Sequence, residues 1–193
     1  TDIYVRDRQL GTTELVSVAF GGGASNSAFS VNGISADGRY VAFASCGANN
    51  LAPGKDTNDQ CDVFVRDRIR QTTERVSVAS DGSQIPSGPF VFTGIWGRHA
   101  ISADGRFVVF NSGAPNLALG GSFRYPTFVH DRATGVTEQV SVAADGTPGE
   151  EFPFSSPYFP PHLAALSADG SVVAFGTVAG NLVGPFGDNN GVD

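Results

Sequence analysis

The sequence ISADGRFVVF occupies residues 101–110, and close copies occupy residues 34–43 (ISADGRYVAF) and 166–175 (LSADGSVVAF). Three copies within 193 residues indicate a chain built from a repeated unit. The Ser-Ala-Asp-Gly part is typical of a turn, because Ser and Asp side chains bond nearby backbone groups and Gly accepts a positive φ. The β-branched and aromatic residues that follow favour a strand. Each copy therefore predicts a turn leading into a strand.

Two further short segments recur between these copies, and both have the composition of strands. Including the strands on either side of the Ser-Ala-Asp-Gly turn, the unit contains four short strands, which we call a, b, c and d. Four short strands repeated at a fixed interval are typical of β-propeller blades. Strand c reads DIYVRDR (2–8), DVFVRDR (62–68) and TFVHDR (127–132), and strand d reads TTELVSVA (12–19), TTERVSVA (72–79) and VTEQVSVA (136–143).

We therefore predict an all-β chain of four-stranded antiparallel propeller blades. The whole of 1–193 is a single propeller portion, with repeat units of about 1–61, 62–126 and 127–193. The chain begins with strands c and d, continues through two complete blades, and stops after strands a and b. The two terminal half-blades are complementary.

The order Ser-Ala-Asp-Gly-Arg-x-Val-x-Phe, Asp-Val-Phe-Val-Arg-Asp-Arg and Thr-Glu-x-Val-Ser-Val resembles the WD40-like PD40 repeats of TolB-like β-propellers. The resemblance covers almost the whole chain and implies a propeller fold. In that family Ser-Pro-Asp-Gly marks the turn between strands a and b, whereas this sequence has Ala36, Ala103 and Ala168 in place of proline. Its repeat is also longer than usual. Propellers serve many purposes, so the resemblance implies little about function.

Open half-blades lead to a hypothesis about assembly. Three blades are too few to close a propeller, which usually has four to eight. Two chains joined head to tail would give six blades and cover strand edges that otherwise stay open. The alternative is that the chain is part of a longer propeller. The lack of any Met, even at position 1, favours a processed or excised product.

Composition and motifs exclude several classes of function. The net charge of −7 argues against binding to a phosphate backbone, so nucleic acid is not an expected partner. No apolar run approaches the length of a membrane span. Nucleophile-elbow, zinc-protease and phosphate-loop motifs are absent from the sequence. The Arg-Asp-Arg motif recurs in each unit, which favours charged strand ends that tie neighbouring blades together. We predict that the chain is not an enzyme.

The two cysteines lie at facing ends of neighbouring predicted strands. Cys46 follows strand b and Cys61 precedes strand c, so an antiparallel pair would bring them together. A disulfide there would fit a secreted or periplasmic protein. Two free thiols are the alternative.

One b–c loop has oxygen-bearing side chains at alternate positions, which suits a Ca²⁺ ion. Asx-turn chemistry in an exposed loop is the alternative. A second, weaker set lies near the C-terminus, and Asp2 of a joined chain would complete it. The candidate ligands are Asp56, Asn58, Gln60 and Asp62 in the first set, and Asp188, Asn190, Asp193 and Asp2 in the second.

Two long loops are rich in aromatic residues, and both are expected on the same face of the blades. Long loops on one face of a repeat array are a usual place for binding. The alternative is a small satellite core beneath each loop. The candidate contacts are Phe90, Phe92, Trp96 and His99 in one loop, and Phe154, Tyr158 and Phe159 in the other.

These observations predict a non-catalytic binding or scaffold module of a secreted or periplasmic bacterial protein. It would recognise a protein or another extracellular ligand through the long-loop face, with calcium as a candidate cofactor of one or more b–c loops. One alternative is a propeller portion that gates or supports a hydrolase or peptidase domain in a longer protein. Another is a structural subunit that assembles by strand complementation.

Overall fold

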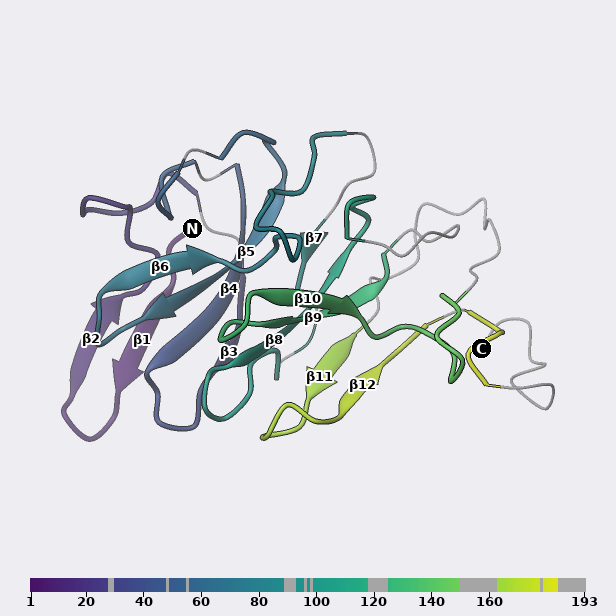
Figure 1. Ribbon diagram of the computed structural model, residues 1–193. Coiled ribbons are helices and arrows are strands. Elements are labelled where there is room, and N and C mark those ends of the chain that lie inside the picture. The colour runs from purple at the N-terminus through teal and green to yellow at the C-terminus, as the bar shows by residue number, and fades with distance from the viewer. Residues whose placement is uncertain are drawn as a thin grey trace.

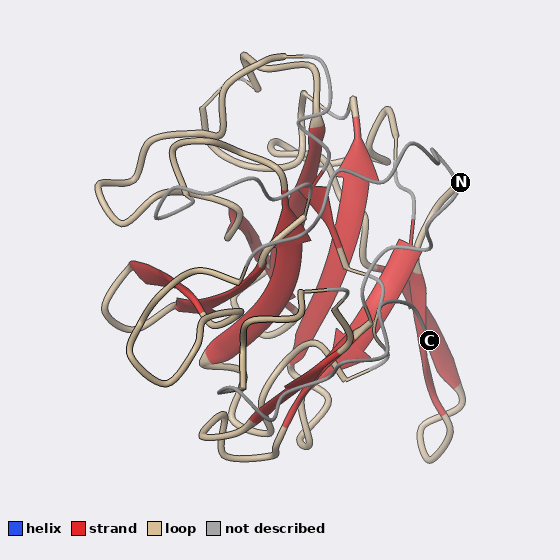
Figure 2. Cartoon of the chain, turned by 90° about the vertical axis from the view of Figure 1, so that its right-hand side faces the viewer, coloured by secondary structure: helices blue, strands red, loops and turns tan. Residues whose placement is uncertain are grey.

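The structure is a computed structural model, and it shows strands and loops but no helix among the described residues (Figure 2). No helix in the described part of the chain has the length and apolar character to cross a bilayer. The described residues are 1–27, 30–47, 49–54, 56–88, 93–95, 97, 99–117, 125–149, 163–177 and 179–183. The strands are β1 (Tyr4–Asp7), β2 (Thr12–Leu15), β3 (Ser30–Ile34), β4 (Tyr40–Cys46), β5 (Cys61–Asp67), β6 (Thr72–Arg75), β7 (Thr93–Gly94), β8 (Phe107–Ser112), β9 (Thr127–Asp131), β10 (Val136–Gln139), β11 (Ala164–Leu166) and β12 (Val173–Phe175).

The strands form four antiparallel sheets, and each strand pairs with its neighbours in the chain. Two full sheets, β3-β4-β5-β6 and β7-β8-β9-β10, are flanked by the N-terminal pair β1-β2 and the C-terminal pair β11-β12. Figure 1 shows the sheets side by side in chain order, from the purple N-terminal pair to the yellow-green C-terminal pair. The predicted all-β class and the predicted strand pairs are confirmed. The described residues form a propeller-like array without closing a ring.

The middle strands of each full sheet are buried on both faces, which explains their near-continuous apolar runs. All seven residues of β5 are buried, including its polar ones. On one face, Val41 and Phe43 pack with Ile3 and Val16, which flank the strands of the N-terminal pair. On the other face, Ala42 packs in a cluster that continues into the second full sheet and the C-terminal pair. The core therefore lies between sheets rather than inside any one of them.

The outer strands are shorter than predicted, because a serine side chain replaces part of the backbone ladder. Strand d was expected to continue to Ala19, but β2 ends at Leu15. The Oγ of Ser17 accepts the N–H of Ile3 at 3.0 Å, and the chain then turns back so that Val18 bridges Ala24. Ser77 and Ser141 accept strand N–H groups in the same way. This repeated bond accounts for the Val-Ser-Val motif.

The predicted Ser-Ala-Asp-Gly turns are confirmed. The Oγ of Ser35 donates to Asp37 Oδ1 at 2.6 Å and accepts the N–H of Tyr40 at 2.9 Å. Gly38 closes the turn with φ of 72°, a conformation that glycine adopts without steric cost. The other two copies of the turn repeat these bonds.

Alanine at the second turn position links one sheet to the next. The N–H of Ala36 donates to the carbonyl of Ala103 at 3.0 Å, and the N–H of Ala103 donates to the carbonyl of Ala168 at 2.7 Å. Proline has no N–H and would break this ladder. Alanine at this turn position therefore has a structural role.

Candidate binding site

A hollow of about 800 Å³ opens beside the N-terminal pair. We use "the hollow" for the space lined by Tyr4 to Arg6 of β1, Val31 to Ile34 of β3, His99 and Ile101, among others. β1 lines it with its free side, because the described residues pair β1 with β2 alone. An unpaired strand edge offers a row of backbone donors and acceptors to an added strand.

The walls of the hollow combine apolar side chains with a few polar groups. Tyr4 of β1 and Val31 and Ile34 of β3 are each more than half exposed, and together they give the hollow an exposed apolar wall. The Nδ2 of Asn32 donates to the carbonyl of Ile95 at 2.8 Å, so this amide is already held by the backbone. An exposed apolar surface next to a strand edge suits a strand-forming segment better than a small polar ligand.

His99 is the predicted contact residue that the structure places at the hollow. The sequence pointed to His99 but missed Tyr4, Val31 and Ile34. A comparison of the repeats could have identified Tyr4. It occupies the same position in strand c as Phe64 and Phe128, which are buried apolar residues. The other predicted contacts, Phe90, Phe92, Trp96, Phe154, Tyr158 and Phe159, lie outside the described residues, and their roles stay predictions.

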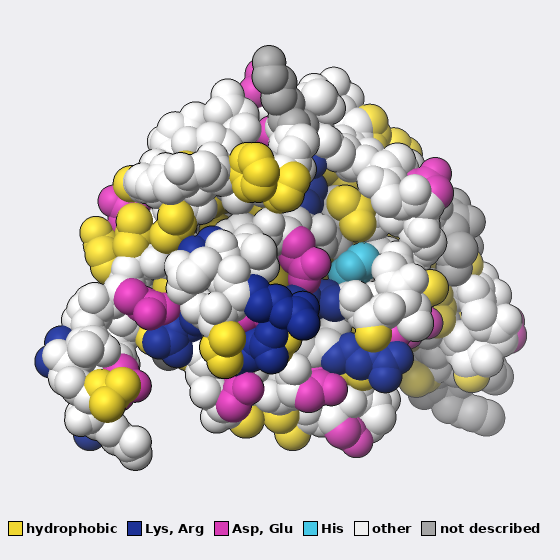
Figure 3. Space-filling model, turned by 60° about the vertical axis from the view of Figure 1, so that its left-hand side comes forward, with side chains coloured by type: hydrophobic (Ala, Val, Ile, Leu, Met, Phe, Trp, Pro, Cys, Tyr) yellow, Lys and Arg dark blue, Asp and Glu magenta, His cyan; other side chains and the backbone are white. Residues whose placement is uncertain are grey.

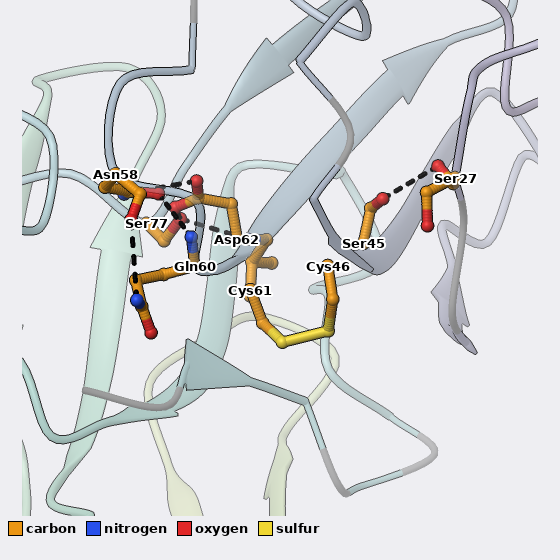
Figure 4. Close-up of a disulfide and its surroundings, with 9 residues drawn as sticks. Ser27, Ser45, Cys46, Asn58, Gln60, Cys61, Asp62 and Ser77 are labelled. Atoms are coloured by element: carbon orange, nitrogen blue, oxygen red, sulfur yellow. Dashed lines mark hydrogen bonds between the residues drawn. A yellow bond between two sulfur atoms is a disulfide. The ribbon is translucent and has the colours of Figure 1, made fainter. Parts of the chain in front are cut away.

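The b–c loop of the first full sheet is held by its own polar side chains. The N–H of Asn58 donates to Asp56 Oδ1 at 3.1 Å, and the N–H of Gln60 donates to Asn58 Oδ1 at 2.8 Å. Asn58 also donates to the carbonyl of Ile85 at 2.9 Å, which fastens the loop to the segment after β6. Figure 4 shows Asn58, Gln60 and Asp62 clustered next to Ser77. These bonds are those of successive Asx turns.

Arg75 lies against the two carboxylates of this loop. Its guanidinium is 3.3 Å from Asp62 and 3.7 Å from Asp56. Burial raises the pKa of Asp62 to about 6, although Arg75 and the hydroxyl of Ser77 oppose the shift. Among the described residues, no group of three or more His, Cys, Asp or Glu side chains is arranged to hold a metal ion.

Calcium binding stays a prediction for this loop and for the second ligand set. Asp188, Asn190 and Asp193 of that second set lie outside the described residues. Asp2 accepts a hydrogen bond from Ser17 at 3.4 Å, the same contact that Asp62 makes with Ser77. A Ca²⁺ ion at residues 56–62 would need Arg75 to move, since the ion and the guanidinium compete for the same oxygens. Titration with Ca²⁺ followed by thermal unfolding tests this, and binding would raise the melting temperature.

The predicted disulfide is present. Cys46 and Cys61 face each other as direct partners at the end of the β4–β5 ladder, and their sulfurs are bonded (Figure 4). Among the described residues there is no free cysteine.

The recurring Arg-Asp-Arg motif ties strands and sheets together, as predicted. Asp67 accepts two bonds from Arg39, at 3.0 and 2.6 Å, and this pairing lowers the pKa of Asp67 to about 2. The second arginine of the motif reaches the preceding sheet: Arg68 donates to Glu14, and Arg132 donates to Glu74. Figure 3 shows basic and acidic side chains next to one another over one face. These charges are engaged in repeated structural pairs.

Similarity to known proteins is found among solved structures. No family model matches the sequence, and no curated protein matches it. The chain is similar to the crystal structure of TolB from Acinetobacter baumannii, with 19% sequence identity and a TM-score of 0.45. The similarity covers 90% of this chain and 31% of that chain, so the chain spans about a third of the TolB length.

Proposed function

We propose that the chain is a non-catalytic binding and scaffold module of the β-propeller type, and that its hollow receives a pair of β-strands from a protein partner. The observation that carries this proposal is the free edge of β1 beside exposed apolar side chains. Tyr4 is 59% exposed, whereas its counterparts in the full sheets, Phe64 and Phe128, are 1% and 0% exposed. A strand pair in the hollow would give Tyr4 the cover that the repeat provides elsewhere.

The energetics favour an extended partner. Strand addition satisfies backbone groups along β1, and alternate side chains of the added strand pack on the apolar wall. Burying Tyr4, Val31 and Ile34 contributes roughly 25 cal/mol for each Å² of apolar surface removed from water. The backbone bonds supply affinity, and the fit of the side chains supplies specificity.

Location and the absence of catalysis form part of the proposal. The Cys46–Cys61 disulfide supports an extracytoplasmic protein, since disulfides persist in oxidising compartments. The motif carboxylates Asp67 and Asp131 are engaged by Arg39 and Arg106, which supports a structural use of these charges. Recognition through the long aromatic loops would add to binding at the hollow.

A synthetic peptide of residues 30–45 tests the proposal, because it contains a complete a–b strand pair of the repeat. Added in excess to the isotopically labelled chain, it should slow hydrogen exchange at the free edge of β1. Val31→Asp in the chain should abolish this effect by placing a charge in the apolar wall. Ile69→Asp is the matched control, because Ile69 is an equally apolar residue, 72% exposed, in a turn away from the hollow.

The proposal is contradicted if the peptide leaves β1 unprotected. It is also contradicted if the two aspartate variants lose binding equally, since the hollow would then have no special role.

A further inference from the structure

The N-terminal pair, the first full sheet and the second full sheet are joined in succession by the same arginine contact. Arg68 donates to Glu14 of the preceding sheet and to the carbonyl of Gly38 in its own sheet. Arg132 repeats both contacts, with Glu74 and with the carbonyl of Gly105. The arginine thus contacts two groups at once: a glutamate on strand d of one unit and the turn glycine of the next.

The arginine at the start of this series and the glutamate at its end form no such contact within the described residues. Arg8 occupies the same motif position as Arg68, and Glu138 the same position as Glu74. Both side chains are exposed, and neither forms an ion pair within the described part of the chain. Gly170, the counterpart of Gly38, closes the turn of the C-terminal pair with φ of 75°. Arg8 therefore lies at one end of the array, and both of its expected partners lie at the other.

The alanine ladder is open at the same two ends. Ala36 and Ala103 donate toward the C-terminal pair, as described above. Ala168 accepts from this ladder, but its own N–H has no acceptor among the described residues. At the other end, the carbonyl of Ala36 receives no such bond within the same part of the chain. A free donor at one end again matches a free acceptor at the other.

Stacked aromatic pairs show the same pattern. Phe43 stacks on Phe64, and Phe110 stacks on Phe128, each with ring centroids 5.7 Å apart across neighbouring strands b and c. The third pair in the series is Phe175 of β12 with Tyr4 of β1. These two residues lie in the terminal pairs, where their strands are unpaired with each other.

We propose that a second copy of this chain fills the hollow, so that β12 of one copy pairs with β1 of the other. This inference deepens the proposed function and rests on it. Arg8 of one copy then contacts Glu138 and the carbonyl of Gly170 of the second copy. The N–H of Ala168 meets the carbonyl of Ala36 across the same joint. One docking movement supplies the missing partners of Arg8, Ala168 and Tyr4, a match that an unrelated strand would not provide.

The joint closes a ring when it forms twice. Each chain contributes two full sheets and two half-sheets. Two copies joined head to tail therefore complete six four-stranded sheets, which falls within the usual four to eight blades of a propeller. The two joints are identical, and each joint pairs the free edge of β1 with the free edge of β12. The ring thus removes the edges that would otherwise template aggregation.

Native mass with charge reversal at the joint tests the inference. The chain of 20.0 kDa should have a mass of about 40 kDa by light scattering. Arg8→Glu alone and Glu138→Arg alone place like charges at both joints, and each should weaken dimerisation at least tenfold. Arg70→Glu is the matched control, since Arg70 is an exposed arginine of the first full sheet outside the joint, and its dimer should persist.

Mixing the two charge-reversal variants tests directly whether Arg8 and Glu138 meet at the joint. An equal mixture of the Arg8→Glu and Glu138→Arg chains has an opposite-charge pair at each joint, so the mixture should recover the mass of two copies. A chain carrying both substitutions should recover it as well. Recovery also shows that the single variants are folded.

A monomeric wild-type chain would overturn the inference, as would a dimer that both charge reversals leave intact or a mixture that stays monomeric. If the chain is monomeric but the 30–45 peptide still protects β1, strand-pair binding stands and the second copy is the wrong occupant. If the peptide also fails, the proposed function fails with it.

Discussion

At the residue scale, the motif aspartate recurs at three positions in two different settings. Asp7, Asp67 and Asp131 each accept N–H groups of the turn that follows the strand. In the full sheets, the same carboxylate also holds Arg39 or Arg106 with two bonds. In the C-terminal pair, Ser171 occupies the arginine position, so Asp7 has no such cation to receive in the proposed joint. The local turn and the ion pair can therefore be separated by mutation.

Asp67→Asn should lower the free energy of unfolding at pH 7 by about 2 kcal/mol, a value typical of hydrogen bonds to a charged group. The pKa of Asp67 in the folded protein is about 2, below its ordinary value of 3.8. The stabilisation is therefore fully present above about pH 4 and is lost as the pH falls toward 2. Urea unfolding across this pH range measures the effect, and the variant should show a weaker dependence on pH.

Asp7→Asn is the control for this experiment, because it keeps the turn position and lacks the arginine. Its cost should be well under that of Asp67→Asn. Equal costs would mean that the turn bonds, rather than the ion pair, stabilise the sheet.

Asp62 should show the opposite pH dependence. Burial raises its pKa to about 6, so the folded chain binds this proton more tightly than the unfolded chain does. The associated stability is present below about pH 4 and is lost as the pH rises through 6. Carboxyl NMR titration should give a midpoint near 6 for Asp62. A midpoint at the ordinary value of 3.8 would show that Arg75 and Ser77 cancel the effect of burial.

At the scale of elements, the β4–β5 and β8–β9 ladders differ at one end. The first is closed by the Cys46–Cys61 disulfide, and the second by a hydrogen bond from Ser112 to the carbonyl of Pro126 at 3.1 Å. Replacing both cysteines by serine should cost about 3 kcal/mol, the loop-entropy estimate for a crosslink of this span. Chemical denaturation of the oxidised protein and the variant measures this cost.

Hydrogen exchange locates the effect of that change. The end of the β4–β5 ladder should exchange faster in the serine variant, while the β8–β9 ladder stays unchanged. Faster exchange in both ladders would indicate that the disulfide supports the whole array instead of one sheet.

The a–b turns also pack sheet against sheet. Gly105 has φ of 76°, and a Cβ there would collide with the ring of Tyr40 from the preceding sheet. Gly105→Ala should therefore destabilise by about 1–3 kcal/mol beyond the cost of the positive φ alone, because the ring must shift. Gly82→Ala is the matched control, with φ of 82° and open space around the added carbon.

Thermal or urea unfolding of the two alanine variants gives the difference directly. Equal destabilisation would show that the Tyr40 contact is easily relieved and that the turn does not set the spacing of the sheets.

At the scale of the whole molecule, the proposed ring changes the protection of specific edges. In the wild-type chain at concentrations where two copies associate, the free edges of β1 and β12 should exchange slowly. In the Arg8→Glu chain they should exchange quickly, because their backbone groups face water. The outer edge of β10 should behave alike in both chains, since the joint does not cover it. Protection that does not depend on association would contradict the ring.

Sequence periodicity alone predicted the all-β class, the repeated strand order, the complementary terminal pairs and the Cys46–Cys61 pair. These features depend on local turn chemistry and on spacing along the chain, which a sequence displays directly. Arg-Asp-Arg was likewise recognised as structural, because a motif present in each unit is unlike a single active site.

The tertiary structure alone decided where the hollow lies and which groups lack a partner within the described ranges. Tyr4 looks like Phe64 and Phe128 in the sequence, and only its position beside a missing strand pair leaves it exposed. The oxygens of residues 56–62 looked free to bind a cation, yet Arg75, distant in sequence from Asp56, reaches them through the β5–β6 pairing. The exposure and pairing of these side chains are set by contacts between sheets. The spacing of repeats in the sequence does not show which of these contacts form.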